Sequence, residues 1–110
     1  MAKITIENKM DKNLSVLYIG EFEDNGKITY VERDSNALTT ISYDESGLDI
    51  TRLFDNNKTI LHLYEEAYGS LESEYGILPL DVEVLDYQKD EHRIIVEYRV
   101  QDTFLFTIEF

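Results

Sequence analysis

Clusters of turn-forming residues recur about every ten positions along this chain, and no other feature constrains its fold as strongly. Apolar and polar residues alternate between the clusters, which is the pattern of a β-strand with one buried and one solvent-facing side. Leu78, Leu80, Val82 and Val84 show this alternation most clearly. Short strands at such a spacing are typical of an antiparallel all-β sandwich or barrel.

The alternation predicts strands that follow one another as an up-and-down meander. The predicted strands cover residues 3–7, 14–23, 28–33, 38–43, 48–54, 59–64, 71–75, 77–87, 92–100 and 103–110. Asn25-Gly26, within residues 24–27, accepts the positive φ values of a type I′ turn and predicts a hairpin there. Tyr75-Gly76 suits a corner, and Pro79 suits a strand start, an edge or a bulge because it lacks an N–H. Residues 61–74 are the one helical candidate, but they fit a 3.6-residue period poorly.

The last predicted strand, residues 103–110, is strongly apolar and would promote aggregation at an open sheet edge. Pairing it with the first strand removes that edge. We therefore expect one domain, residues 1–110, in which an antiparallel up-and-down meander closes into a barrel of about eight to ten strands. The interior of such a barrel is filled by side chains or holds one small ligand.

The formal net charge of −13 limits the possible partners. A nucleic-acid-binding protein needs a basic surface to displace counterions from phosphate, and no basic cluster occurs in this sequence. An anionic membrane surface is disfavoured for the same reason. The acidic residues concentrate between positions 44 and 91, where they form either a solubilising surface or a docking patch for a basic protein.

The expected cellular location and cofactors follow mainly from features that the sequence lacks. There is no cysteine, so disulfides and thiolate metal sites are ruled out. No apolar run approaches the ~18 residues of a membrane span, and none follows Met1 as in a signal peptide. We expect a cytoplasmic protein without a metal or other cofactor, as a monomer or a homodimer.

Two charged residues interrupt faces that are otherwise apolar. Glu32 shares a face with Ile28 and Tyr30, and Arg52 shares one with Leu48 and Ile50. If both faces point inward, Glu32 and Arg52 need partners, because an unpaired buried charge costs several kcal/mol. Three alternatives remain open: an interior ion pair assisted by tyrosine hydroxyls, an Arg52 that meets an acidic group of a ligand, or two charges at the barrel rim.

Three tyrosines are candidates for the interior. Tyr30, Tyr75 and Tyr98 would each bury a large ring while needing a partner for the hydroxyl. We predict that these tyrosines, with Glu32 and Arg52, line or approach a cavity for a small apolar or amphipathic molecule.

The usual catalytic constellations are missing. With no cysteine, a catalytic triad would depend on His62, expected on an outer face, or His92, expected in an exposed turn. No phosphate-binding loop, zinc motif or calcium loop is present. We therefore expect a protein that is not an enzyme.

Several short segments resemble the YwiB-like family, which are small uncharacterised bacterial β-barrel proteins grouped with the calycins, the lipocalin-like barrels. The resemblance rests on Lys3-Ile4-Thr5-Ile6, Tyr30-Val31-Glu32, Leu38-Thr39-Thr40-Ile41, Ile50-Thr51-Arg52, Tyr75-Gly76-Ile77-Leu78-Pro79-Leu80 and Ile94-Ile95-Val96-Glu97-Tyr98. It implies a calycin-type barrel of about eight main strands, and calycin relatives commonly bind small apolar ligands in the lumen. It implies no activity, since a fold does not supply one. The sequence departs from the family pattern at Glu74, and residues 65–69 look like an insertion.

The alternative function is a protein–protein interaction module. It would present either the acidic surface or an outward apolar row formed by Leu17, Ile19, Val31 and Ile41, and such a row makes a homodimer plausible.

Overall fold

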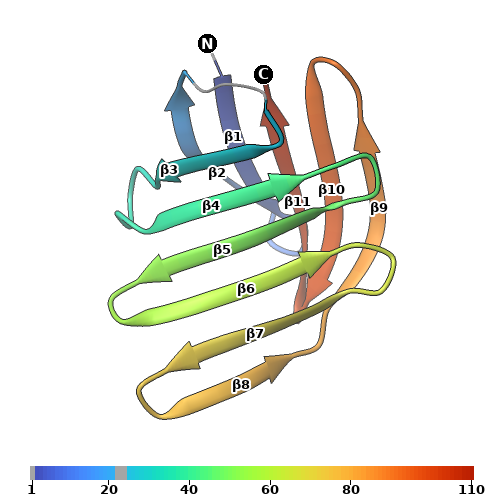
Figure 1. Cartoon of the computed structure of the whole chain (residues 1–110). Helices are drawn as coiled ribbons and strands as arrows, with labels where there is room; N and C mark the ends of the chain where they lie inside the picture. Colours follow the sequence, from blue (N-terminus) through green and yellow to red (C-terminus); the bar gives the residue numbers. More distant parts are fainter. Residues whose placement is uncertain (1, 22–24) are drawn as a thin grey trace.

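The computed structural model describes residues 2–21 and 25–110, and in these residues the chain is all-β. They form eleven strands in two antiparallel sheets and contain no helix (Figure 1). The predicted all-β class is therefore confirmed. No membrane-crossing helix is present in this part of the chain.

One sheet has five strands and combines both ends of the chain. Its strands are β1 (Ala2–Asn8), β2 (Asn13–Gly20), β9 (Glu83–Lys89), β10 (Arg93–Val100) and β11 (Asp102–Glu109). They lie in the order β2-β1-β11-β10-β9. The first and last strands are thus neighbours, with Ile4 opposite Ile108, which confirms the predicted pairing of the chain ends.

The other sheet has six strands from the middle of the chain. They are β3 (Lys27–Val31), β4 (Leu38–Tyr43), β5 (Leu48–Phe54), β6 (Asn57–Leu63), β7 (Tyr68–Ser73) and β8 (Gly76–Leu80). Each pairs with the next along the chain, as in a meander. Gly76 starts β8 with a φ of +123°, so the corner expected at Tyr75-Gly76 is a tight hairpin. Pro79 lies on the edge strand β8, where its missing N–H leaves no gap inside the sheet.

The core lies between the sheets, whose strands run crosswise to one another (Figure 1). Alternation along each strand sends one set of side chains into this layer. Its fully buried members are Ile4, Ile28, Ile41, Leu48, Leu63, Ile94, Val96 and Ile108. The core is therefore built mostly from branched aliphatic residues, which pack well on a pleated surface.

The two sheets remain separate, so neither closes on itself. No ladder pairs β2 with β3, or β8 with β9, among the described residues. At the first junction, the Arg33 amide just after β3 donates to the Leu17 carbonyl of β2, at 3.0 Å. At the second, only Asp81 and Val82 separate β8 from β9.

Two local predictions are wrong. Asn25-Gly26 does not form a hairpin, because β2 and β3 belong to different sheets, although Gly26 does have a positive φ of 87°. The strand predicted over residues 77–87 is interrupted at Asp81 and Val82, where the chain changes sheets. Residues 61–74, which fit a helical period poorly, contain no helix: they lie in the hairpin of β6 and β7, close to the predicted strands 59–64 and 71–75. The parts of the predictions that concern Phe22, Glu23 and Asp24 lie outside the described residues.

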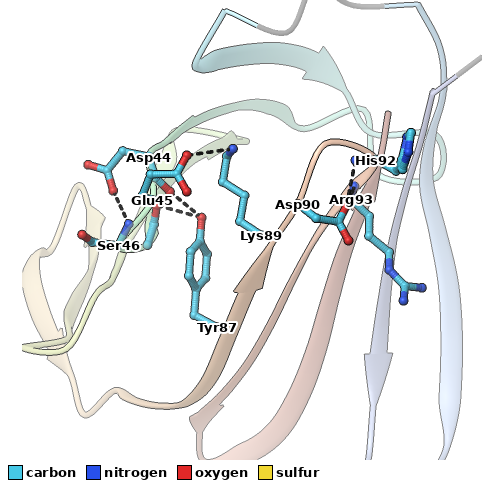
Figure 2. Close-up of polar contacts among 9 residues, drawn as sticks. Asp44, Glu45, Ser46, Tyr87, Lys89, Asp90, His92 and Arg93 are labelled. Atoms are coloured by element: carbon cyan, nitrogen blue, oxygen red, sulfur yellow. Dashed lines mark hydrogen bonds and ion pairs between the residues drawn. The ribbon is translucent and has the colours of Figure 1, made fainter.

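A polar clasp joins the β4–β5 turn to the edge strand β9 (Figure 2). The Tyr87 hydroxyl donates to the carbonyl oxygens of Asp44, at 2.8 Å, and Gly47, at 3.2 Å. Beside it, Lys89 Nζ lies 3.2 Å from Glu45 Oε1. Burial, and then the nearby Asp44 carboxylate, raise the pKa of Tyr87, so its hydroxyl remains a donor. The clasp therefore links the two sheets at the β4–β5 turn without strand pairing.

Candidate functional site

A cavity of about 280 Å³ lies between the inner faces of the two sheets. Its lining residues are Ile6, Leu17, Tyr30, Glu32, Thr39, Ile50, Arg52, Thr59, Leu61, Tyr98 and Phe106. A larger hollow at the β8–β9 junction is lined by Asp81, Val82, Glu83, Arg99 and Gln101. The smaller cavity is the better candidate, because it alone of the two combines an apolar wall with buried polar groups, the usual character of a ligand site.

Strand register explains why one wall of the cavity is polar. Tyr30, Thr39, Arg52 and Thr59 are successive cross-strand partners on β3, β4, β5 and β6. Residues directly opposite one another in a sheet point to the same face, so these four form one row facing inward. Glu32 continues the inward alternation of β3 one step beyond the strand's end. The opposite wall, from the five-stranded sheet, is apolar apart from Tyr98.

Glu32 is the acceptor at the centre of the polar wall. Arg52 Nε donates to both of its carboxylate oxygens, at 3.1 and 3.0 Å. The Ser35 hydroxyl donates to Oε1 at 2.8 Å, and the Thr39 hydroxyl donates to Oε2 at 2.9 Å. Each oxygen therefore accepts two hydrogen bonds, and Glu32 itself is only 6% exposed. The interior ion pair was one of the alternatives left open by the sequence, but hydroxyls of serine and threonine assist it instead of the expected tyrosines.

The turn after β3 places Ser35 under the Glu32 carboxylate. The Glu32 amide donates to the Ala37 carbonyl at 2.9 Å, and the Asn36 amide donates to the Glu32 carbonyl at 3.1 Å. Asn36 has a φ of +62°, a left-handed conformation that asparagine tolerates better than most residues. The Asp34-Ser35-Asn36 turn thus closes around its own Glu32.

Two opposing effects set the pKa of Glu32. Burial on its own would raise it, because the charged form loses hydration. The hydrogen bonds from Arg52, Ser35 and Thr39 outweigh burial and hold the pKa of Glu32 below its ordinary value of 4.5. The carboxylate is therefore ionised at neutral pH, and with the Arg52 guanidinium it forms a pair of zero net charge.

Tyr30 is the unusual residue of the site. It is 4% exposed, and its hydroxyl has no hydrogen-bond partner among the described residues. The Thr39 hydroxyl lies near the phenol and donates to Glu32, but its oxygen is not placed to accept the phenol proton. Burial, followed by the Glu32 carboxylate, raises the pKa of Tyr30, so the phenol keeps its proton. A buried donor without an acceptor is rare in native proteins and calls for a specific explanation.

Arg52 has unused donors as well. Its Nε is occupied by Glu32, and its guanidinium lies 5.5 Å from the centre of the Phe54 ring. Its two Nη groups, in contrast, donate to no described residue. The side chain lines the cavity and is 36% exposed, so it is also reached by solvent.

Four of the five predicted ligand-binding residues lie around this cavity. Tyr30, Glu32, Arg52 and Tyr98 line it, whereas Tyr75 does not. Tyr75 is 92% exposed in the β7–β8 turn, so its predicted position in or near the cavity is wrong. The turn begins after Ser73, before the alternation could point Tyr75 inward.

Three polar residues of the site, Thr39, Ser35 and Thr59, were not predicted from the sequence. Alternation along residues 38–43 places Thr39 on the same face as buried Ile41 and Tyr43, which is a usable signal. Ser35 gives no such signal, since its role depends on how one turn folds back.

The histidines lie outside the cavity. His62 is on the outer face, as expected, where Nδ1 lies 2.5 Å from Asp49 Oδ1 and the ring stacks between Tyr64 and Tyr68. No serine or threonine hydroxyl of the described residues hydrogen-bonds to it. His92 is exposed in the β9–β10 turn, where Asp90 accepts the amides of His92 and Arg93 (Figure 2). Across residues 2–21 and 25–110, no cluster of three or more histidines and acids could hold a metal.

The outward apolar row differs from the predicted one. Ile41 is fully buried and Leu17 lines the cavity, so these two assignments are wrong. Val31 and Ile19 are exposed as predicted. Val31 is instead followed across the sheet by Leu38 and Leu53, which are also exposed.

Comparison with known proteins adds no relative. No family model matches the sequence, and neither the curated proteins nor the solved structures contain a significant match.

Proposed function

We propose that this protein is a non-enzymatic binding protein whose inter-sheet cavity takes one small amphipathic molecule. The observation that carries the proposal is the buried Tyr30 hydroxyl, which lines the cavity without a partner. Leaving a buried polar group unsatisfied costs about 1–3 kcal/mol. A ligand atom that accepts this hydrogen bond recovers that free energy on binding.

The two walls of the cavity favour a ligand with one polar and one apolar end. Tyr30 and Arg52 offer donors on one side, while Ile6, Leu17 and Phe106 offer only apolar surface on the other. Burying a ligand's hydrocarbon against these side chains contributes roughly 25 cal/mol per Å². The polar groups then fix the orientation of the ligand, as in most small-molecule sites.

The cavity volume limits the size of the ligand. At the ~30 Å³ that one water occupies in the liquid, about 280 Å³ corresponds to roughly nine water-sized groups. We therefore propose a molecule of about nine or ten non-hydrogen atoms.

We also propose that the chain is a relative of the YwiB-like proteins and that its two sheets correspond to a calycin-type barrel with two unpaired seams. The pairing of β1 with β11 supports this idea, as does the Arg33–Leu17 hydrogen bond at one seam. At the other seam, β8 continues into β9 through only Asp81 and Val82.

Native mass spectrometry of the protein isolated from the cells that produce it tests the ligand proposal. We expect a mass excess that disappears on denaturation. Thr59→Phe, which places a ring inside the cavity, should abolish the excess. Thr51→Phe is the matched control, because Thr51 lies on the same sheet but on its outer face, one residue away from Arg52. A bare protein mass, or an excess that Thr59→Phe retains, would contradict the proposal.

The interaction module stays a prediction. Its surface would be the exposed row of Val31, Leu38 and Leu53 or the acidic residues between positions 44 and 91.

A further inference from the structure

We propose that the polar end of the ligand is an uncharged hydrogen-bond acceptor, such as a ketone or ester carbonyl, and not a carboxylate. This inference rests on the proposed function and adds the chemical class of the head group.

The polar wall offers unused hydrogen-bond donors but no unused strong acceptor. The Tyr30 phenol has a proton to donate, and the Arg52 Nη groups can only donate. The one strong acceptor, Glu32, already receives four hydrogen bonds. The hydroxyls of Tyr98 and Thr59 can donate or accept, so they favour neither an accepting nor a donating head group. The wall can therefore still donate hydrogen bonds to a ligand, and the ligand's polar end must accept them. This excludes a head group that only donates, such as an ammonium.

The charges of the polar wall are already balanced. Glu32 and Arg52 carry one charge of each sign, and they already satisfy each other at 3.0 Å. A bound carboxylate would add a second anion to a partly buried site that contains one cation. Buried charges are stable only when they are paired, so this anion would remain uncompensated. The overall charge of −13 repels an approaching anion as well.

A neutral carbonyl accepts hydrogen bonds and adds no charge to the site. It offers two lone pairs, enough for the Tyr30 hydroxyl and one N–H of Arg52, and it leaves the site with zero net charge. The hydrocarbon part of the ligand can then lie against Leu17 and Phe106.

Matched probes of one chain length test the inference. 2-Octanone, octanoate and octylammonium each contain eight carbon atoms and differ in the head group, and their dissociation constants at pH 7 can be measured by NMR titration. We expect 2-octanone to bind at least tenfold more tightly than either charged probe.

The Tyr30→Phe variant tests the donor directly. Losing one neutral hydrogen bond should weaken 2-octanone binding about fivefold. Tyr18→Phe is the matched control, because the ring centroids of Tyr18 and Tyr30 are 5.4 Å apart. The Tyr18 hydroxyl donates to the Glu21 carbonyl, and Tyr18 does not line the cavity. The control should keep the wild-type affinity, and circular dichroism of both variants verifies their folding.

The outcomes separate the inference from the proposed function. Octanoate binding more tightly than 2-octanone would overturn the neutral head group while leaving the cavity as the binding site. An unchanged 2-octanone affinity in folded Tyr30→Phe would overturn the role of the phenol. Absence of binding by every probe would instead count against the proposed function itself.

Discussion

Replacing Arg52 with methionine removes the cation that compensates the buried Glu32 carboxylate. Methionine keeps an unbranched apolar stem of similar length, so the change acts mainly on charge and hydrogen bonding. Glu32 would retain the hydroxyls of Ser35 and Thr39 but lose both hydrogen bonds from Nε.

The expected cost follows from the burial of the two partners. Removing one member of a fully buried ion pair costs about 3–5 kcal/mol. Arg52 is 36% exposed, so water replaces part of its role, and we expect Arg52→Met to lower the free energy of unfolding by about 2 kcal/mol at pH 7. Adding Glu32→Gln removes the uncompensated charge and should restore about 1 kcal/mol, as a double-mutant cycle would measure.

The pH dependence has a defined sign. In the wild type, the folded-state pKa of Glu32 lies below 4.5, so its stabilising contribution is present above pH 4.5 and is lost as the pH falls through the folded-state pKa. Without Arg52, burial dominates and raises that pKa, so the variant loses stability as the pH rises through its own folded-state pKa. The stability difference between variant and wild type should therefore shrink as the pH falls from 7 towards 4.

Urea unfolding followed by far-UV circular dichroism measures these differences, since the chain has no tryptophan. A loss below about 0.5 kcal/mol for Arg52→Met, unchanged by Glu32→Gln, would refute the reasoning, because it would make the pair an ordinary screened surface contact.

Three further substitutions test other parts of the structure by the same unfolding assay. Gly47→Ala should destabilise by about 1–3 kcal/mol, because the new Cβ would lie 2.3 Å from the Leu63 carbonyl oxygen; a neutral effect would contradict this packing. Tyr87→Phe should cost about 1 kcal/mol by removing the hydrogen bonds to Asp44 and Gly47, and faster amide exchange confined to the β4–β5 turn would identify the clasp as the cause. Tyr75→Ser should change stability by less than about 0.5 kcal/mol and leave ligand affinity unchanged, because the side chain is 92% exposed; a clear loss of affinity would restore Tyr75 to the site.

Alternation of apolar and polar residues predicted most strands, because each strand has one face in the core. Ile28 and Tyr30 on β3, and Glu32 just after it, do point to the same inner side, and that pattern alone predicted that Glu32 and Arg52 share a site. Pairing of the chain ends was predictable too, since the apolar β11 needs a neighbour on each side.

The points at which the chain passes from one sheet to the other were not predictable from the alternation of apolar and polar residues. Leu80, Val82 and Val84 all pack against the core, so the alternation continues in phase across the junction and conceals the break between β8 and β9. The Asn25-Gly26 pair predicts only the local backbone conformation. The sheet that β3 joins depends on packing between residues far apart in the sequence. The lack of a hydrogen-bond partner for the Tyr30 hydroxyl was equally unpredictable from the sequence, because it depends on every side chain that lines the folded cavity.

Locating a bound probe inside the protein tests the central claim most directly. Intermolecular NOEs between 2-octanone and methyl-labelled protein report which side chains touch the ligand. The cavity predicts NOEs to Ile6, Leu17 and Leu61, with none to the outer-face residues Val31 and Leu38. NOEs confined to the outer face, or a saturating probe that leaves the cavity methyl groups unaffected, would contradict the account.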